Sequence, residues 1–186
     1  MVLCTETSKL TSVHIVSYVS PIGDLWAAAT DQGICYLEFK EEDIQRRQLE
    51  AFCIKWELEV KEQTNESLEL LVKQLDEYFH KTIRQFDLPL HLLGTEFQQK
   101  VWIQLLQIPF GQTISYEKLS LKMEQPLAIR AIANANGQNP IAILVPCHRV
   151  IGKDGSLTGY AGGMWRKQWL LEHESNLPKQ SKLFFG

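Results

Sequence analysis

Three short runs rich in β-branched and aromatic residues lie within the first forty positions of the chain, at residues 13–19, 25–30 and 34–39. The gaps between them, 20–24 and 31–33, contain proline, glycine and aspartate, which favour turns. Gaps this short join antiparallel neighbours, whereas parallel strands need long crossover connections. The sequence therefore predicts that the chain begins with an antiparallel sheet.

The following fifty residues alternate between helical and extended patterns. We expect a charged helix over about 41–53, a strand near 56–60 and an amphipathic helix over about 67–80, and we expect 86–90 to rejoin the sheet. The amphipathic helix has apolar residues at helical spacing: Leu68, Leu71, Leu75 and Phe79. No group of reactive side chains stands out in this half, so its aromatic residues are interpreted as core.

A mostly helical part begins near Gly94. Thr95 and Gln98 have the spacing of a capping box, which marks a helix N-terminus. An apolar stripe that includes Phe97 and Val101 then continues to the Pro-Phe-Gly sequence at 109–111. These features predict a helix that ends before residue 109.

Two short helices are expected next, at about 116–123 and 127–136, with Pro126 in the first turn of the second. Together they form a helix-turn-helix pattern over about residues 116–136. Such a pattern occurs in DNA-binding proteins and also in purely structural helix pairs. Taken alone, it leaves both interpretations open.

The second of these helices has two different faces. One face is apolar, with Ala128, Ile132 and Ala135, and we place Ile129 beside it. The opposite face is small and polar: Arg130, Ala133, Asn134 and Gly137 fall at i, i+3, i+4 and i+7. It is either a solvated face with one arginine or a surface that approaches DNA closely.

Charge is unevenly divided along the chain. The net charge is −3, but residues 1–90 hold nine basic and sixteen acidic residues, whereas residues 91–186 hold ten and six. A surface for nucleic acid would therefore lie in the C-terminal half. No apolar run approaches the length that spans a bilayer and no signal pattern opens the chain, so we expect a cytoplasmic protein.

Four cysteines, Cys4, Cys35, Cys53 and Cys147, form no C-x-x-C pair and no regular framework. This usage suits free thiols in a reducing compartment. The spacing of Cys4 and Cys35 relative to the histidines does not resemble a zinc ligand set, so no metal is predicted.

A cysteine and a histidine stand side by side after the apolar run 143–146. We expect this run to form a buried strand, and Pro146 would then deliver Cys147 and His148 to its rim with little freedom. A thiol beside an imidazole is a candidate nucleophile, because the imidazole can raise the thiolate fraction. The alternative is a buried cysteine that serves as a small apolar residue.

The wider C-terminal sequence decides between these readings through a resemblance. Over about residues 94–175 the chain closely resembles the O6-alkylguanine-DNA alkyltransferases, also called methylated-DNA–protein-cysteine methyltransferases. The segments that carry the match are Ser115-Tyr116, Ala128-Ile129-Arg130-Ala131, Ala135-Asn136-Gly137-Gln138-Asn139-Pro140, Pro146-Cys147-His148-Arg149-Val150-Ile151-Gly152, Leu157-Thr158-Gly159-Tyr160-Ala161-Gly162-Gly163 and Trp169-Leu170-Leu171. The PCHRV core is highly specific for the family.

The resemblance implies an α/β fold in two parts. Residues 1–91 would form a ribonuclease H-like α/β domain with an antiparallel sheet and a structural role. Residues 92–186 would form a mostly helical domain that contains the helix-turn-helix and carries DNA binding and catalysis.

Catalytic roles follow from the same resemblance. Cys147 would accept the alkyl group, and His148 would act as general base through a water. Two glutamates of the last helix compete to orient the histidine; the family spacing selects Glu174 over Glu172. Asn139 would hold the pocket in register with the DNA-facing helix.

Binding roles are implied as well. The glycine-rich loop after Cys147 would wrap the base, with Tyr160 as an aromatic wall and the backbones of Val150 and Ala161 as hydrogen-bonding groups. Tyr116 would rotate the target phosphate and contact the guanine. On the DNA-facing helix, which the family places in the minor groove, Arg130 would fill the gap left by a flipped base. Ala133 and Asn134 would lie beside it on that face.

The expected function is single-use DNA repair, in which an alkyl group moves irreversibly from guanine O6, and also from thymine O4, to Cys147. The protein would act as a monomer on double-stranded DNA, without a cofactor. A lesion-binding alkyltransferase-like protein is the alternative, but such proteins typically replace the cysteine. Three departures from the usual family pattern, Ala133 for Gly, Ala161 for Ser and Glu124-Gln125-Pro126 for Gly-Asn-Pro, are expected to affect affinity rather than chemistry.

Overall fold

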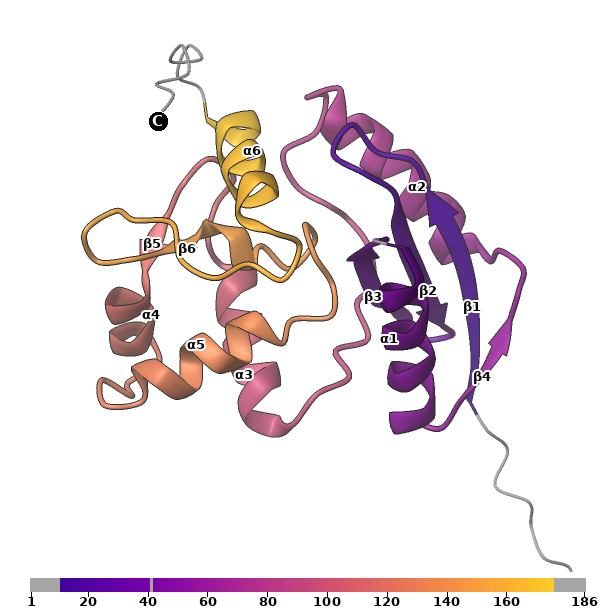
Figure 1. The fold of residues 1–186 in the computed structure, drawn as a ribbon, viewed down its shortest axis with the longest axis horizontal. Helices are drawn as coiled ribbons and strands as arrows, with labels where there is room; N and C mark the ends of the chain where they lie inside the picture. The colour runs from indigo at the N-terminus through magenta and orange to yellow at the C-terminus, as the bar shows by residue number, and fades with distance from the viewer. Residues whose placement is uncertain (1–10, 41, 176–186) are drawn as a thin grey trace, which may run out of the picture.

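The computed structural model describes residues 11–40 and 42–175, which form an N-terminal part with a sheet and a helical C-terminal part beside it (Figure 1). The sheet has the order β3-β2-β1-β4. Its strands are β1 (Thr11–Tyr18), β2 (Leu25–Thr30), β3 (Gly33–Phe39) and β4 (Leu58–Lys61). The predicted antiparallel pairing of the first three strands is confirmed. β4 differs, because it pairs with β1 in parallel after a helical crossover.

Two helices cover opposite faces of this sheet. Side chains alternate between the faces of a strand, so Ala27 and Ala29 join one hydrophobic core while Ala28 joins the other. Helix α2 (Glu66–Phe79) packs on the first face through its predicted leucines, and α1 (Glu42–Lys55) packs on the second through Leu49 and Cys53. The C-terminal part shares the core on the α2 side.

The connection after α2 pairs with the sheet through a single isolated bridge among the described residues. Within the expected strand at 86–90, Leu90 forms an isolated parallel bridge with Ile34, so this segment touches β3 without becoming a full strand. The N–H of Ile34 donates to the carbonyl of Pro89 at 2.9 Å. The chain then reaches α3 (Glu96–Leu106), whose predicted capping box between Thr95 and Gln98 is confirmed.

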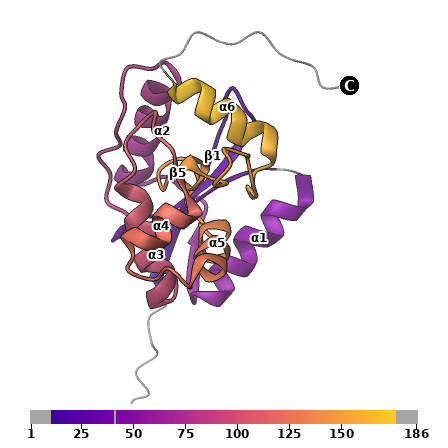
Figure 2. The same ribbon diagram turned by 90° about the vertical axis from the view of Figure 1, so that its left-hand side faces the viewer.

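Two short helices follow on the side of the molecule away from the sheet, as Figure 2 shows with that side facing the viewer. They are α4 (Tyr116–Lys122) and α5 (Ile129–Gly137). The placement of Pro126 in the first turn of α5 is wrong, because α5 begins three residues later, after a separate turn. The strands β5 (Ile114–Ser115) and β6 (Val150–Ile151) pair in parallel, and α6 (Met164–Glu174) closes the described chain.

The segment before Cys147 is not the strand that its composition predicts. Residues 141–149 are all buried, but after the bridge residue Ile141 they form turns and a short 3₁₀-helix η1 (Cys147–Arg149). Ile143 adopts a positive φ of 69°, which is incompatible with a regular strand. The physical reason is the lack of a partner strand along this run: the edge strand β3 offers one bridge, between Leu37 and Ile141.

Several contacts join the two parts of the molecule. The N–H of Leu37 donates to the carbonyl of Pro140, and the N–H of Ala142 donates to the carbonyl of Leu37. From α6, Arg166 donates to the carbonyl of Ile22 and stacks over Phe39 at 4.5 Å. The segment that leads to Cys147 is therefore attached directly to the edge of the sheet. Within the described residues, no helix combines the length and apolar character needed to cross a membrane.

Candidate functional site

Cys147 begins η1 and is buried, with 7% of its surface exposed. The amide of Asn139, also buried, donates to Sγ of Cys147 at 3.2 Å and to the carbonyl of Val145 at 2.9 Å. Its carbonyl oxygen accepts from the N–H of Ile141 at 3.0 Å. One side chain thus satisfies the backbone groups of an irregular turn and fixes the thiol at its end.

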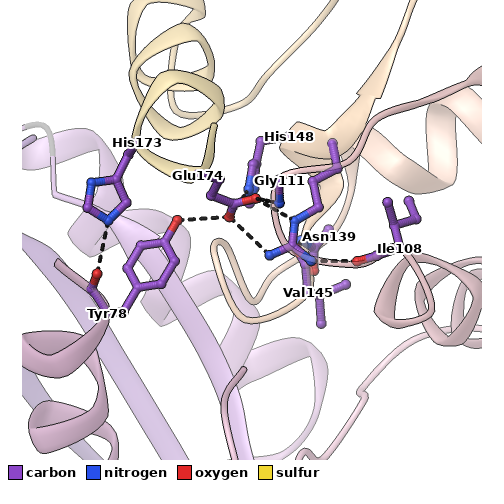
Figure 3. A network of polar contacts seen from close by, with 9 residues as sticks. Tyr78, Ile108, Gly111, Asn139, Val145, His148, His173 and Glu174 are labelled. Atoms are coloured by element: carbon purple, nitrogen blue, oxygen red, sulfur yellow. Dashed lines mark hydrogen bonds and ion pairs between the residues drawn. The ribbon is translucent and has the colours of Figure 1, made fainter. Parts of the chain in front are cut away.

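Glu174 is the centre of a buried polar network (Figure 3). Its Oε1 lies 2.9 Å from Nε2 of His148, and both side chains are almost fully buried. Arg149 approaches the same carboxylate from the other side, with Nε 2.8 Å from Oε2 and Nη2 3.0 Å from Oε1. Such a bidentate pair holds the carboxylate in position and also stabilises its ionised form.

Two further groups complete the coordination of Glu174. The hydroxyl of Tyr78, from α2 of the N-terminal part, donates to Oε1 at 2.9 Å. The N–H of Gly111 donates to Oε2 at 3.3 Å. Gly111 has a φ of 74°, and a Cβ there would lie 2.7 Å from the carbonyl oxygen of Glu174, so glycine is required at this position.

The network keeps Glu174 ionised and His148 neutral. Burial alone would raise the pKa of Glu174, but the hydrogen bonds and charges of His148 and Arg149 outweigh it and hold that pKa well below its ordinary value. Burial lowers the pKa of His148, opposed by Glu174. An ionised carboxylate accepts a hydrogen bond, so Nε2 of His148 carries the proton and Nδ1 is left as a base. Nδ1 is buried and has no hydrogen-bond partner among the described residues.

The thiol itself is protonated at rest. Burial raises the pKa of Cys147 to about 11, and the hydrogen bond from Asn139 opposes the rise. Since a thiolate is the nucleophilic form, a reaction at neutral pH requires a base that takes the thiol proton. The neutral imidazole of His148, the next residue, is suited to that role.

A small cavity of about 10 Å³ adjoins Cys147. Its wall includes Tyr160 and Ala161 from the glycine-rich loop and also Glu38 from β3. The hydroxyl of Tyr160 is buried without a partner among the described residues.

The loop that carries this wall is held by Lys167. Its Nζ donates to the carbonyl of Val150 at 2.6 Å and to the carbonyl of Thr158 at 2.7 Å, so the carbonyl of Val150 already has one donor. Lys167 is fully buried, and burial lowers its pKa to about 8.

The surface of α5 has the two faces that its sequence predicts, with one exception. Ile132 and Ala135 are buried, whereas Arg130 and Asn134 are exposed and Ala133 is half-buried. The exception is Ile129, which the sequence predicts beside the apolar face but which is 36% exposed. Tyr116 begins α4, and its hydroxyl accepts from the amide of Asn136 on α5 at 3.2 Å.

Among the described residues, no cluster of three or more His, Cys, Asp or Glu side chains has the geometry of a metal site. Cys35, Cys53 and Cys147 are free, and Cys4 lies outside the described residues.

Comparison with known proteins covers both parts of the chain. Residues 13–92 match the family "6-O-methylguanine DNA methyltransferase, ribonuclease-like domain", and residues 96–176 match its "DNA binding domain". A methylated-DNA–protein-cysteine methyltransferase of Methanosarcina barkeri is 41% identical over 157 residues, which are 84% of this chain and 94% of that protein. The chain belongs to this methyltransferase family. The relative from Mycobacterium leprae is 42% identical over 88% of this chain and 93% of its own.

Solved structures of these methyltransferases have the same fold. The crystal structure of Mycobacterium tuberculosis O6-methylguanine methyltransferase superposes with a TM-score of 0.73 at 41% identity, and it covers 90% of this chain and 96% of that one. A structure of the same organism's OGT in complex with DNA has a TM-score of 0.71 at 40% identity, with 88% and 92% covered.

Most residues that the sequence singled out lie together in this methyltransferase. Cys147, Asn139, Tyr160 and Ala161 line one cavity. His148 pairs with Glu174, while Glu172 is exposed and accepts a hydrogen bond from Gln168 instead. Arg130 and Asn134 are exposed on α5 and are not among the residues that line this cavity.

Besides Glu38, four residues of the methyltransferase site were not assigned a role from the sequence: Tyr78, Gly111, Arg149 and Lys167. Two of them could have been identified from the sequence, because Arg149 interrupts a buried run and Lys167 lies on a helix beside apolar residues. A charge in such a place must find a partner. Tyr78 and Gly111 had no signal, since their contacts with Glu174 join distant parts of the sequence.

Proposed function

We propose that this methyltransferase repairs DNA by moving an alkyl group from guanine O6, and also from thymine O4, to the sulfur of its own Cys147. The observation that carries the proposal is the arrangement around Cys147: a thiol held by Asn139 precedes a neutral histidine whose other nitrogen is bound to an ionised glutamate. This is the order of nucleophile, base and orienting group. Family membership supports the same activity.

The target base must leave the duplex before it can react, because its O6 substituent lies inside the stack. We assign the approach to α5, in the minor groove. Its exposed face is small enough for close contact, and Arg130 projects from it to occupy the space of the flipped nucleotide. Asn134 and Ala133 border this arginine. Tyr116, beside α5, is assigned to the target phosphate and the extruded base.

The flipped base would lie in the cavity at Cys147 against the ring of Tyr160. The cavity of about 10 Å³ is smaller than a base, so the loop that Lys167 holds must move outward on binding. The backbones of Val150 and Ala161 are assigned to hydrogen bonds with the base edge. A carbonyl has two lone pairs, so that of Val150 can accept a second donor beside Lys167.

In the transfer step, Sγ of Cys147 attacks the alkyl carbon, the S–C bond forms and the C–O bond to guanine breaks. The thiol proton passes to Nδ1 of His148 through a water, as in the family pattern, while Glu174 stabilises the imidazolium. The departing guanine recovers a proton and is left unmodified. A thioether has no easy leaving group, so each molecule reacts once. No cofactor takes part.

The free thiols of Cys35, Cys53 and Cys147 suit a reducing compartment such as the cytoplasm. We infer a monomer on double-stranded DNA, since one chain supplies the nucleophile, the base and the DNA-facing helix.

Intact mass spectrometry after incubation with O6-methylguanine DNA tests the proposal. We expect a gain of one methyl group that saturates at one per chain. The variant Cys147→Ala should gain none yet still bind the damaged duplex, whereas Cys35→Ala and Cys53→Ala should react as the parent does. Methylation of Cys147→Ala, or DNA binding by the parent without any mass gain, would overturn it.

A further inference from the structure

Glu38 is an acidic residue on the wall of the Cys147 cavity, and the proposed transfer step does not involve it. It lies near the end of β3, the edge strand that contacts the C-terminal part. Its neighbour Leu37 is hydrogen-bonded on both sides to the segment before Cys147, through Pro140 and Ala142. The position of Glu38 at the site is therefore fixed by backbone contacts.

The packing of the glycine-rich loop completes this placement. Gly162 lies so close to the ring of Phe39 that a Cβ would be 2.6 Å from it. The cavity at Cys147 is thus closed between this loop and the end of β3, with Glu38 and Tyr160 both on its wall. Glu38 also lines a larger groove of about 560 Å³ that extends toward α1.

The surroundings of the Glu38 carboxyl offer little compensation for a negative charge. Glu38 forms no ion pair among the described residues. The titratable and charged groups around it come from several elements: Tyr36 on β3, Lys40 just after β3, Lys55 on α1, Cys147 on η1, Tyr160 in the loop, and Arg166 and Lys167 on α6. Lys40 lies over the ring of Trp26, which is opposite Glu38 on β2. Glu38 is half-buried, and this burial raises the pKa of its carboxyl to about 8, opposed by the backbone N–H of Phe39.

We propose that Glu38 is a positioning residue of the alkyl-transfer site: its carboxyl shares the cavity with the Cys147 thiol, so that a negative charge on Glu38 makes formation of the Cys147 thiolate less favourable. The N-terminal part of the chain thereby influences when the thiolate forms. The inference rests on the proposed function to the extent that Cys147 is the alkyl acceptor.

This arrangement has a distinct consequence for pH dependence. Below about pH 8 the Glu38 carboxyl is neutral and leaves the thiol to titrate by itself. Above that pH the carboxylate forms and its charge raises the pKa of Cys147, as the direction of their interaction requires. The rate at which the Cys147 thiol reacts should therefore rise with pH less steeply above about pH 8 than it would if Glu38 carried no charge.

The test compares Glu38→Gln with the parent between pH 6 and 10, a range that spans the titration of Glu38 and stays below the pKa of the Cys147 thiol. Iodoacetamide alkylation of Cys147, followed by peptide mass spectrometry, reports the thiolate without any need for DNA. Methyl transfer from O6-methylguanine DNA is measured in parallel. We expect the ratio of variant to parent rates to climb with pH by about tenfold, which corresponds to one pKa unit. The exposed Glu69→Gln on α2 is the matched control and should follow the parent.

A merely structural role would change the rates of Glu38→Gln by the same factor at every pH, and that result would overturn the inference. Glu38→Asp keeps the charge and should restore the bend in the profile, which excludes a packing effect. If the iodoacetamide profiles diverge as expected but no methyl group is transferred from DNA, the inference stands and the proposed function fails. If methyl transfer occurs but the pH profiles of Glu38→Gln and the parent coincide, the proposed function stands and the inference about Glu38 fails.

Discussion

Oε1 of Glu174 lies 2.9 Å from Nε2 of His148, and neither side chain has appreciable contact with solvent. Because Arg149, Tyr78 and Gly111 also donate to this carboxylate, it cannot turn away from the histidine without breaking several hydrogen bonds. The contact therefore fixes the ring of His148 and leaves its Nδ1 as the nitrogen that can accept a proton.

Loss of this pair should slow methyl transfer without preventing DNA binding. We expect His148→Ala and Glu174→Gln to reduce the rate on the order of 10²–10⁴-fold, the usual effect of losing a general base or its support. The remaining reaction should depend on spontaneous ionisation of a thiol whose pKa burial raises to about 11, so its rate should shift toward higher pH. Single-turnover kinetics across pH measures both effects. Glu172→Gln is the control, and a larger defect there than in Glu174→Gln would refute the assignment.

Glu174 should also contribute to stability in a pH-dependent way. Its pKa is lower in the folded protein than in the unfolded chain, so its contribution is complete above the unfolded pKa of about 4.3 and is lost as the pH falls toward the lowered folded value. At neutral pH, Glu174→Gln leaves Arg149 buried without its counter-charge and should cost about 3–5 kcal/mol of unfolding free energy. Urea unfolding of parent and variant between pH 7 and pH 3 should show this gap narrow with acid. A constant gap would contradict the assigned pKa.

Asn139 should matter for folding and for the thiol separately. Asn139→Ala removes a partner of three buried backbone groups, the carbonyls of Ile141 and Val145 and the N–H of Ile141, which typically costs about 1–3 kcal/mol for each group left unsatisfied. Asn139→Asp can still accept from Ile141 but cannot donate to Cys147, and it adds a negative charge beside the thiol. We expect Asn139→Asp to raise the thiol pKa further, observed as slower iodoacetamide alkylation at a given pH. Equal thiol reactivity in Asn139→Asp and the parent would show that Asn139 acts on the backbone alone.

Local signals in the sequence were enough to predict much of this fold. The strands β2 and β3 follow from runs bounded by turn residues, and the start of α3 follows from the two residues of its capping box. Each of these features depends on neighbours along the chain. The prediction failed where partners were distant: residues 143–146 have strand composition but no strand to pair with, so they form turns held by Asn139.

The same distinction applies to the candidate site. Cys147 and His148 are adjacent in the sequence, so their association was visible there. The choice of Glu174 over Glu172 depended on family spacing, because both lie on α6 and only tertiary packing brings one of them to His148. Tyr78 and Glu38 come from the half that was interpreted as purely structural. The fold brings them to the site through contacts that no short-range pattern encodes.

Arg130 should be needed for duplex DNA but not for a free base. It is exposed on α5, away from the cavity, and its assigned task is to occupy the space that a flipped nucleotide leaves. Flipping costs a few kcal/mol. If Arg130 offsets about 1.4–2.8 kcal/mol of that cost, Arg130→Ala should slow repair of duplex DNA about 10- to 100-fold. Reaction with free O6-alkylguanine should be almost unchanged, because that base needs only the cavity at Cys147.

The comparison requires a charge-matched control, since any lost cation weakens DNA binding through counterion release. Lys73→Ala removes an exposed cation from α2 and should leave both reactions intact. Tyr116→Phe should slow the duplex reaction and also, to a smaller extent, the free-base reaction. Its hydroxyl is assigned to the base as well as to rotation of the phosphate. Single-turnover rates on duplex and free base, measured at two salt concentrations, separate these effects. Equal losses on both substrates for Arg130→Ala would mean that Arg130 supports the fold or the cavity. The proposal that α5 binds in the minor groove would then be refuted.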